Sequence, residues 1–209
     1  MKVLIGCEFS GTVRDAFLSR GHDAWSCDIL PTEKPGPHIT GDVLQVLNEG
    51  WDLAIFHPPC TFLTCSAEWA YQDEIPHKKM KPGTLIGVAR REARNEAVEF
   101  VRKLLAAPVG KICIENPIGV LSSRIRKPDQ IIQPHQFGHD ASKSTCLWLK
   151  GLQPLIATEH IAPRMVNGRP RWANQTDSGQ NRLGPSQDRW AKRSETYSGI
   201  ARAFAEQWG

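Results

Sequence analysis

The stretch Val3-Leu4-Ile5-Gly6-Cys7-Glu8-Phe9-Ser10-Gly11 near the start of the chain decides the fold. Its first four residues are an apolar run typical of a buried strand, and Ser10-Gly11 is typical of a turn. The apolar residues that follow the turn lie at helical spacing and are Val13, Ala16, Phe17 and Leu18. The sequence therefore opens with a strand, a turn and a helix, which is the unit from which α/β sheets are built.

The same pattern recurs along the chain. Further apolar runs are expected to form strands at residues 24–27, 52–56, 112–114, 130–133 and 146–149. Helical spacing follows Gly41-Asp42 at residues 43–47 and is longest at residues 89–107. Because strands alternate with helices, we predict an α/β fold with a mainly parallel, Rossmann-like sheet covered by helices on both faces.

Polar residues follow several of these strands. In parallel sheets ligands bind beyond the carboxyl ends of the strands. This rule directs attention to one shared crevice lined by Cys7 to Gly11, Asp28, Asp42, Pro58-Pro59-Cys60 and Glu115-Asn116.

Composition limits the class of protein. A chain of 209 residues with 40% hydrophobic residues can bury the core of one medium domain. No apolar run approaches the ~20 residues that cross a bilayer, and Glu8 comes too early for a signal peptide. The six cysteines show no Cys-x-x-Cys or other zinc spacing. We therefore expect a cytoplasmic, reduced protein with no membrane segment and no metal.

Cys60 and Glu115 have the chemistry of a reactive pair. Two prolines fix the backbone before Cys60, and Pro117 follows Glu115-Asn116 at the end of another strand. A thiolate and a carboxyl group facing each other suit attack on an electron-poor ring, because the acid neutralises charge on a ring nitrogen as the thiolate adds to carbon. The alternatives are that Cys60 is a small buried apolar residue and that Glu115 caps a helix.

The ordered series Phe9-Ser10-Gly11, Asp28, Gly41-Asp42, Pro58-Pro59-Cys60 and Glu115-Asn116-Pro117 resembles the motifs of cytosine-5 DNA methyltransferases, particularly the short phage- and prophage-encoded members. The resemblance spans about residues 1–150. It implies a methyltransferase sheet and S-adenosyl-L-methionine as cofactor, with DNA as partner, in the cytoplasm of a bacterial host if a phage encodes the chain.

The resemblance also implies roles for single residues. The cofactor would lie against Phe9, Ser10, Gly11 and Pro58, with Asp28 on the ribose hydroxyls and Asp42 on the adenine amino group. Cys60 would attack C6 of cytosine, while Glu115, beside Asn116, would contact N3 and the exocyclic amine. The target base would first have to leave the helical stack.

Three features depart from that family. Lys143 is the cation near the position where the family carries an arginine that holds the cytosine carbonyl, although Lys143 could equally be a solvated loop residue. A basic stretch, residues 77–83, lengthens the segment between Cys60 and Glu115. About sixty residues follow residue 150, too few for a full target-recognition domain and a closing helix.

These features give a domain plan of three parts. Residues 1–150 form the catalytic domain, residues 151–193 an irregular basic segment, and residues 194–209 a helix that packs back on the catalytic domain. In the basic segment we expect arginines to contact the DNA backbone and Trp172 or Trp190 to stack on nucleobases, with little sequence specificity. The DNA could be double- or single-stranded, and the sequence leaves the oligomeric state open.

Other functions fit part of the sequence. Enzymes that methylate amino groups use an Asp or Asn and an aromatic residue around two prolines, and His57-Pro58-Pro59-Cys60 has neither. A non-catalytic nucleic-acid-binding protein on a methyltransferase scaffold would explain the absent recognition domain, but not an intact Cys60 and Glu115. Cytosine in RNA or in a free nucleotide remains an alternative substrate.

Overall fold

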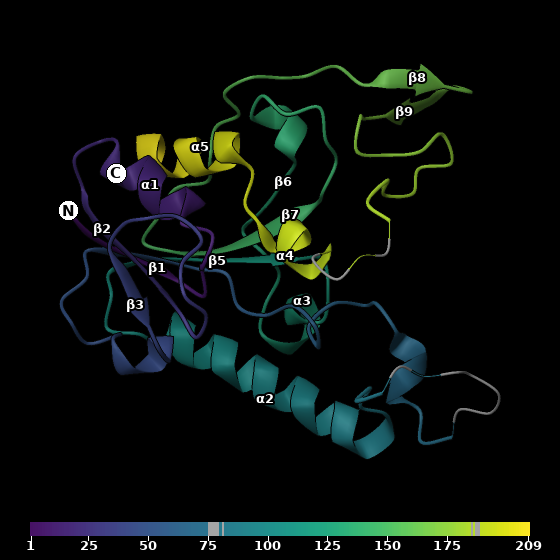
Figure 1. Ribbon diagram of the computed structural model, residues 1–209, viewed down its shortest axis with the longest axis horizontal. Helices are drawn as coiled ribbons and strands as arrows, with labels where there is room; N and C mark the ends of the chain where they lie inside the picture. Colours follow the sequence, from purple (N-terminus) through teal and green to yellow (C-terminus); the bar gives the residue numbers. More distant parts are fainter. Residues whose placement is uncertain (75–79, 81, 185, 187–188) are drawn as a thin grey trace.

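A computed structural model describes residues 1–74, 80, 82–184, 186 and 189–209 of the chain (Figure 1). The strands are β1 (Lys2–Gly6), β2 (Asp23–Asp28), β3 (His38–Thr40), β4 (Leu53–Phe56), β5 (Lys111–Pro117), β6 (Gln130–Ile132), β7 (Thr145–Lys150), β8 (Arg164–Val166) and β9 (Arg169–Arg171). The helices are α1 (Thr12–Leu18), α2 (Gly87–Leu105), α3 (Leu121–Arg124), α4 (Arg189–Ser194) and α5 (Ser198–Trp208). Short 3-10 turns are η1 (Val43–Gln45), η2 (Glu68–Tyr71) and η3 (Pro134–Gln136).

In the described part of the chain, seven strands form one sheet in the order β3-β2-β1-β4-β5-β7-β6. Strands β1 to β5 are parallel, and β7 runs antiparallel to its neighbours β5 and β6. The chain runs outward from β1 to β3 and then returns to β4 on the other side of β1. This reversal makes a topological switch point at the carboxyl ends of β1 and β4, which is where sheets of this kind bind their ligands. The predicted α/β fold with a mainly parallel sheet is confirmed.

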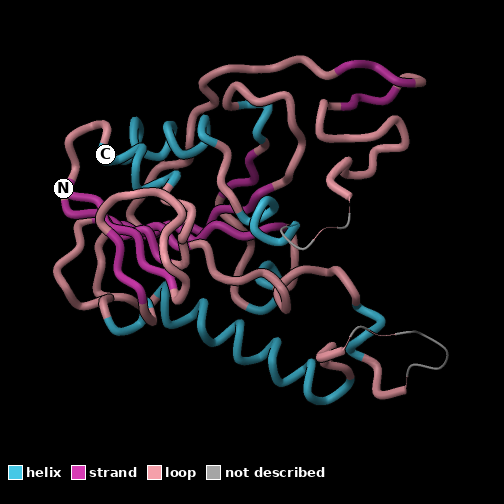
Figure 2. The backbone as a smooth tube through the Cα atoms, viewed as in Figure 1, coloured by secondary structure: helices cyan, strands magenta, loops and turns pink. Residues whose placement is uncertain are grey.

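Helices cover both faces of the sheet (Figure 2). Alternate residues of β1 divide between two cores, because side chains of a strand point to opposite faces. Val3 and Ile5 pack in the core that includes Phe17 of α1 and Phe204 of α5. Leu4 packs in the opposite core, which includes α2 and η1. The covering helices therefore bury the sheet and leave its carboxyl edge for the connecting loops.

The C-terminal part is more ordered than the sequence indicated. Residues 151–193 were expected to be irregular, but β8 and β9 pair as an antiparallel hairpin and α4 follows. The hairpin turns at Asn167 (φ 48°) and Gly168 (φ 72°), and Asn-Gly is the pair that a two-residue turn with positive φ favours. The last helix begins at Ser198, not at Ser194, which ends α4. It packs beside α1, as Figure 1 shows.

Two short elements differ from the sequence-based expectations. Residues 43–47 contain the short turn η1 in place of a full helix, and the short strand β3 had no apolar run to reveal it. In the basic stretch 77–83, residues 77–79 and 81 lie outside the described residues.

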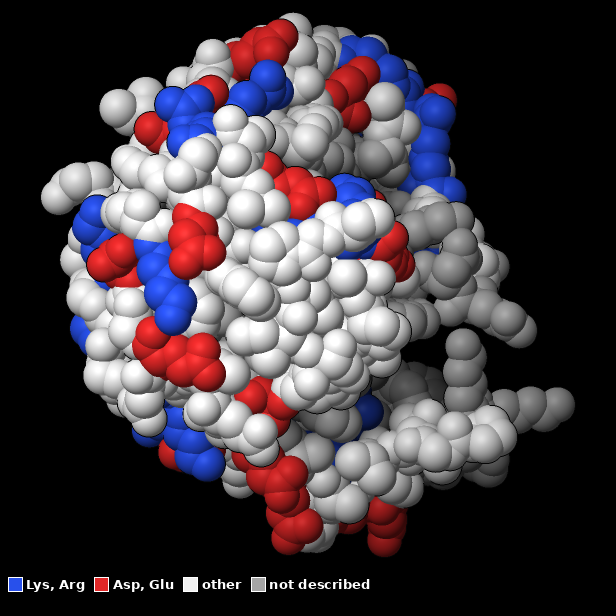
Figure 3. Space-filling model, turned by 60° about the vertical axis from the view of Figure 1, so that its left-hand side comes forward, with Lys and Arg blue, Asp and Glu red and all other residues white. Residues whose placement is uncertain are grey.

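The face in Figure 3 mixes acidic and basic side chains around an uncharged area. The described helices include none that is both long enough and apolar enough to cross a membrane.

Candidate active site

The carboxyl end of β1 leads into α1 through a loop built around Glu8, which is 5% exposed. Its carboxylate accepts hydrogen bonds from the backbone N–H groups of Val13 (2.6 Å) and Arg14 (3.3 Å) and from the Ser10 hydroxyl (3.3 Å). The first N–H groups of a helix have no partner within the helix, and an acid satisfies them well. Ser10, expected at the cofactor, is therefore tied into the capping of α1.

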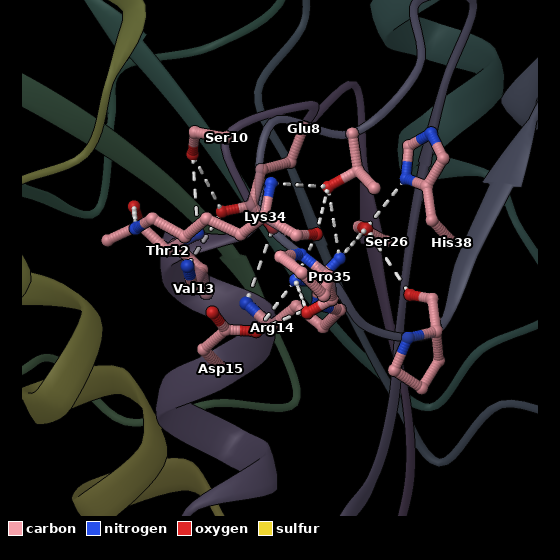
Figure 4. Close-up of polar contacts among 12 residues, drawn as sticks. Glu8, Ser10, Thr12, Val13, Arg14, Asp15, Ser26, Lys34, Pro35 and His38 are labelled. Carbon is pink, nitrogen blue, oxygen red and sulfur yellow. Dashed lines mark hydrogen bonds and ion pairs between the residues drawn. The ribbon is translucent and has the colours of Figure 1, made fainter.

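Arg14 joins this loop to the next one (Figure 4). Its side chain is fully buried, and its guanidinium donates to the Ser26 hydroxyl (3.2 Å) and to the carbonyl oxygens of Lys34 (3.1 Å) and Pro35 (3.2 Å). Gly11, with φ 70°, lies against it, and a Cβ there would come within 2.5 Å of the guanidinium. Arg14 thus fixes the segment after β2 against the start of α1.

Asp28 and Asp42 lie at the carboxyl ends of β2 and β3. Each uses one carboxylate oxygen locally, since Asp28 accepts from the Leu30 N–H (2.9 Å) and Asp42 from the Leu44 N–H (2.9 Å). Burial raises the pKa of the Cys7 thiol far above its usual range, and Asp28 and Asp42 both add to that shift. The structure therefore brings the two aspartates to the loop that follows β1, as predicted.

The ends of β4 and β5 lie next to each other by register. Phe56 pairs with Ile114, so the next residues on the two strands, His57 and Glu115, are neighbours. Nδ1 of His57 lies 2.9 Å from Oε2 of Glu115, and the two side chains are 9% and 12% exposed. His57 was not among the predicted site residues, although it directly precedes Pro58-Pro59-Cys60 in the sequence.

The electrostatic environment keeps Glu115 ionised. Burial acts to raise its pKa, but a hydrogen bond from His57, the positive charge of Lys143 and a hydrogen bond from Thr145 outweigh burial and lower it. At neutral pH Glu115 is therefore a carboxylate. It can accept a proton or a hydrogen bond, and it donates only after taking up a proton.

Asn116 supports the turn before Cys60. Its side chain is 1% exposed, and its Nδ2 donates to the carbonyl oxygen of Pro58 (2.8 Å). Within the described residues, Oδ1 of Asn116 and Nε2 of His57 are buried without a hydrogen-bond partner. Such atoms are uncommon in folded proteins, because a buried polar atom without a partner costs stability. Asn116 and Pro58 therefore hold the backbone that carries Cys60.

Cys60 is exposed beyond the carboxyl end of β4. Its carbonyl oxygen accepts from the N–H groups of Leu63 (3.0 Å) and Thr64 (3.1 Å), which closes a helical turn. Burial and the charge of Glu115 raise the pKa of the Cys60 thiol, and the charges of Lys143 and Arg193 oppose this. The charges of Glu115, Lys143 and Arg193 therefore all act on the sulfur.

The loop after Cys60 is held from two sides. The N–H of Val120 donates to the Leu63 carbonyl oxygen (2.8 Å), and a Cβ on Gly119 would come within 2.0 Å of that oxygen. From α2, the buried Arg94 donates its Nε to the Phe62 carbonyl oxygen (3.0 Å). Neither Gly119 nor Arg94 stood out in the sequence, because only the tertiary structure brings them to this loop.

Lys143 and the C-terminal segment meet beside Cys60. Nζ of Lys143 donates to the carbonyl oxygen of Arg193 (3.0 Å), the last residue but one of α4. Two residues later, the Glu195 carboxylate accepts from the Thr12 hydroxyl (3.3 Å) at the start of α1. The segment from Arg193 to Glu195 therefore links Lys143 to the start of α1.

The expected stacking role of Trp172 is not supported. Its indole already stacks on the imidazole of His135, with ring centroids 4.4 Å apart and an interplanar angle of 16°. The side chain of Trp190 lies outside the described residues. In the hairpin, Arg164 pairs with Asp177 (2.6 Å), while Arg169 is exposed and has no partner among the described residues. The hairpin therefore offers charge rather than a free aromatic surface.

The described residues contain no group of three or more His, Cys, Asp or Glu side chains that could hold a metal ion. No family model and no curated protein matches the chain.

One similar solved structure is a candidate DNA modification methyltransferase encoded within a prophage of E. coli, with 12% sequence identity and a TM-score of 0.42. The alignment covers 79% of this chain and 53% of the other, so this chain spans about half the length of that protein. A likeness this distant carries no argument about function, which rests on the site itself.

Proposed function

We propose that the chain is an S-adenosylmethionine-dependent methyltransferase that methylates C5 of cytosine in DNA, with Cys60 as nucleophile. The observation that supports this most is the arrangement at the ends of β4 and β5. An exposed thiol on a proline-fixed turn lies within electrostatic reach of a buried carboxylate, which His57 and Lys143 keep ionised. A thiol and a carboxylate at one sheet edge suit addition to a pyrimidine ring.

The residues at the ends of β2 and β3 fit the cofactor. In the described chain, the second oxygen of Asp28 and that of Asp42 have no protein partner and can accept hydrogen bonds from hydroxyl or amino groups. The space where a Cβ of Gly41 would lie is open, which leaves room beside Asp42. When bound, S-adenosylmethionine would supply an electrophilic methyl group. Phe9, Gly11 and Pro58 would complete its surroundings at the switch point of the sheet.

The bonds and protons in the proposed reaction of Cys60 and Glu115 can all be accounted for. As Sγ of Cys60 forms a bond to C6 of cytosine, the thiol proton passes to the Glu115 carboxylate. The ring electrons shift so that C5 becomes nucleophilic and N3 takes up a proton, which Glu115 supplies. After C5 is methylated, a solvent water molecule takes the C5 proton as Sγ leaves and the aromatic ring is restored. N3 then returns its proton to Glu115, which passes it back to the Cys60 thiolate. The charges of Lys143 and Arg193 favour the thiolate during addition.

The tail supports DNA as the substrate class. Arg164, Arg169 and Arg171 lie on the β8–β9 hairpin, and a two-stranded ribbon fits the major groove of DNA. As a second candidate function, the exposed arginines would also serve a nucleic-acid-binding protein without catalysis. The covalent chemistry of Cys60 separates the two.

The test is covalent trapping on DNA that contains 5-fluorocytosine. Fluorine at C5 blocks the final elimination, so the wild-type chain should form an adduct in the presence of S-adenosylmethionine. Cys60→Ser should form none, with transfer lowered by about 10³-fold or more, as expected when a nucleophile is removed. Cys65→Ser is the matched control, because Cys65 is also exposed on the same loop. Undiminished adduct with Cys60→Ser would refute the assignment.

A further inference from the structure

The His57–Glu115 pair is a feature that the motif series does not include. The pair lies inside the site proposed above, where His57 helps to keep Glu115 ionised but has no assigned part in orienting it. Its side chain is 9% exposed, and its Nδ1 lies 2.9 Å from Oε2 of Glu115. Its backbone N–H donates to the Gly6 carbonyl oxygen (2.9 Å), which extends the β1–β4 ladder by one residue. This hydrogen bond fixes the backbone that carries the imidazole ring.

The surroundings of the ring decide which nitrogen carries the proton. Nε2 is buried and has no partner among the described residues. A proton on Nε2 would be a buried donor without an acceptor, whereas a proton on Nδ1 is donated to a carboxylate. Of the two ring nitrogens, the geometry therefore favours Nδ1 as the one that carries the donated proton. Nδ1 is engaged by Glu115 and Nε2 is shielded from solvent, so neither nitrogen is available to a substrate.

We infer that His57 is a positioning residue, which orients the Glu115 carboxylate toward the target cytosine by donating a single Nδ1–H hydrogen bond to Oε2. The inference rests on the proposed function for the identity of the substrate. The groups that also act on this carboxylate or sense its charge are Lys143, Thr145 and the thiols of Cys60, Cys113 and Cys146. Of these groups, Thr145 and Lys143 join His57 in lowering the pKa of the Glu115 carboxyl group, against the effect of burial.

The hydrogen bond from His57 leaves one carboxylate oxygen of Glu115 for the base. With Oε2 held by His57, the other oxygen of Glu115 is the one left for the amino group and N3 of the base. Without that hydrogen bond the buried carboxylate can rotate and takes up a proton more readily, because burial disfavours the charged form. Loss of His57 should therefore slow transfer and move the acid limb of its pH profile to higher pH.

The variants His57→Asn, His57→Gln and His57→Leu test the inference. The amide nitrogen of Asn lies two bonds from Cβ, as Nδ1 does, whereas the amide of Gln lies one bond farther. His57→Asn should therefore keep methyl transfer within about threefold of wild type, and His57→Gln and His57→Leu should lose about 10²-fold, the lower end for a general acid–base group. Binding of S-adenosylhomocysteine should be unchanged in all three, which shows that they fold.

The outcomes separate the inference from the proposed function. Full transfer by His57→Leu, or equal losses in His57→Asn and His57→Leu, would overturn the inference while leaving the methyltransferase assignment in place. Wild type that never labels cytosine would overturn the proposed function instead. The tautomer is then still measurable, because ¹⁵N spectra of histidine-labelled protein should show His57 with a protonated Nδ1 and an unprotonated Nε2. A protonated Nε2 would contradict the inference.

Discussion

The ends of β1 and β2 and the ends of β4 and β5 lie at the same edge of one sheet, but they treat buried polar groups differently. At β1 and β2, Glu8 and Arg14 are each satisfied by three or more hydrogen bonds. At β4 and β5, His57 and Asn116 each keep one buried atom that has no hydrogen-bond partner within the described residues. A fully bonded network makes a rigid frame, whereas unpaired polar atoms cost stability and mark a place under functional constraint. The first region reads as a scaffold and the second as the reactive part of the site.

The sharpest test of this contrast is Glu115→Gln. The change should lower methyl transfer by about 10²–10⁴-fold, because a proton carrier is removed. Binding of S-adenosylhomocysteine should not change. Isothermal titration calorimetry and a methyl-transfer assay measure the two effects, and equal losses in both would place Glu115 in the scaffold instead.

The stability of Glu115→Gln should also depend on pH differently from that of wild type. The pKa of Glu115 lies below its ordinary value of 4.5, so the stability that its charge provides is present above pH 4.5 and is lost as the pH falls through the lowered pKa. Wild type should therefore lose more stability than Glu115→Gln between pH 5 and strongly acid pH, in urea denaturation at a series of pH values.

The scaffold is tested by Arg14→Met. Loss of the buried guanidinium leaves the carbonyl oxygens of Lys34 and Pro35 without their donor and should cost about 3–5 kcal/mol in the free energy of unfolding. Arg20→Met is the control, because the exposed pair of Arg20 with Glu206 (3.5 Å) should be worth about 0–1 kcal/mol. Denaturation curves give both values, and equal small effects would show that the network is not a frame.

Asp28→Ala separates the framework of the first region from its ligand contacts. It should weaken cofactor binding by about 1.5–3 kcal/mol, the value of a hydrogen bond to a charged group. Asp23→Ala, at the other end of β2, is the control and should leave binding unchanged. Calorimetry with S-adenosylhomocysteine measures this, and equal affinity in wild type and Asp28→Ala would remove Asp28 from the site.

The smallest expected effect concerns the hairpin. Arg169→Ala should weaken DNA binding slightly and lower the slope of log affinity against log salt concentration by about 0.9, the loss of one phosphate contact. Arg20→Ala, two residues after the end of α1, should leave the slope unchanged. Binding measured at several salt concentrations decides, and identical slopes in all three proteins would argue that the hairpin does not touch the DNA backbone.

The periodic parts of the molecule were readable in the sequence. Apolar runs of four or five residues marked β1 and β4, and helical spacing marked α2, because burial on a sheet or one helix face imposes a regular pattern. Within the candidate site, Cys60 and Glu115 were also visible, since prolines and strand ends mark them locally. The three-residue strand β6 was predicted, but the equally short β3 and the hairpin β8–β9 were missed, because so few residues carry little periodicity.

The sequence by itself therefore determined an α/β sheet and pointed to Cys60 and Glu115 as candidate residues at its carboxyl edge. Only the tertiary structure decided which side chains meet there. The register of β4 with β5 places His57 beside Glu115, and the return of α4 lets the charge of Arg193 act on Cys60. The partners in these contacts are 58 and more than 100 residues apart in the chain. Local patterns report on burial over a few residues, whereas such contacts depend on how the whole chain packs.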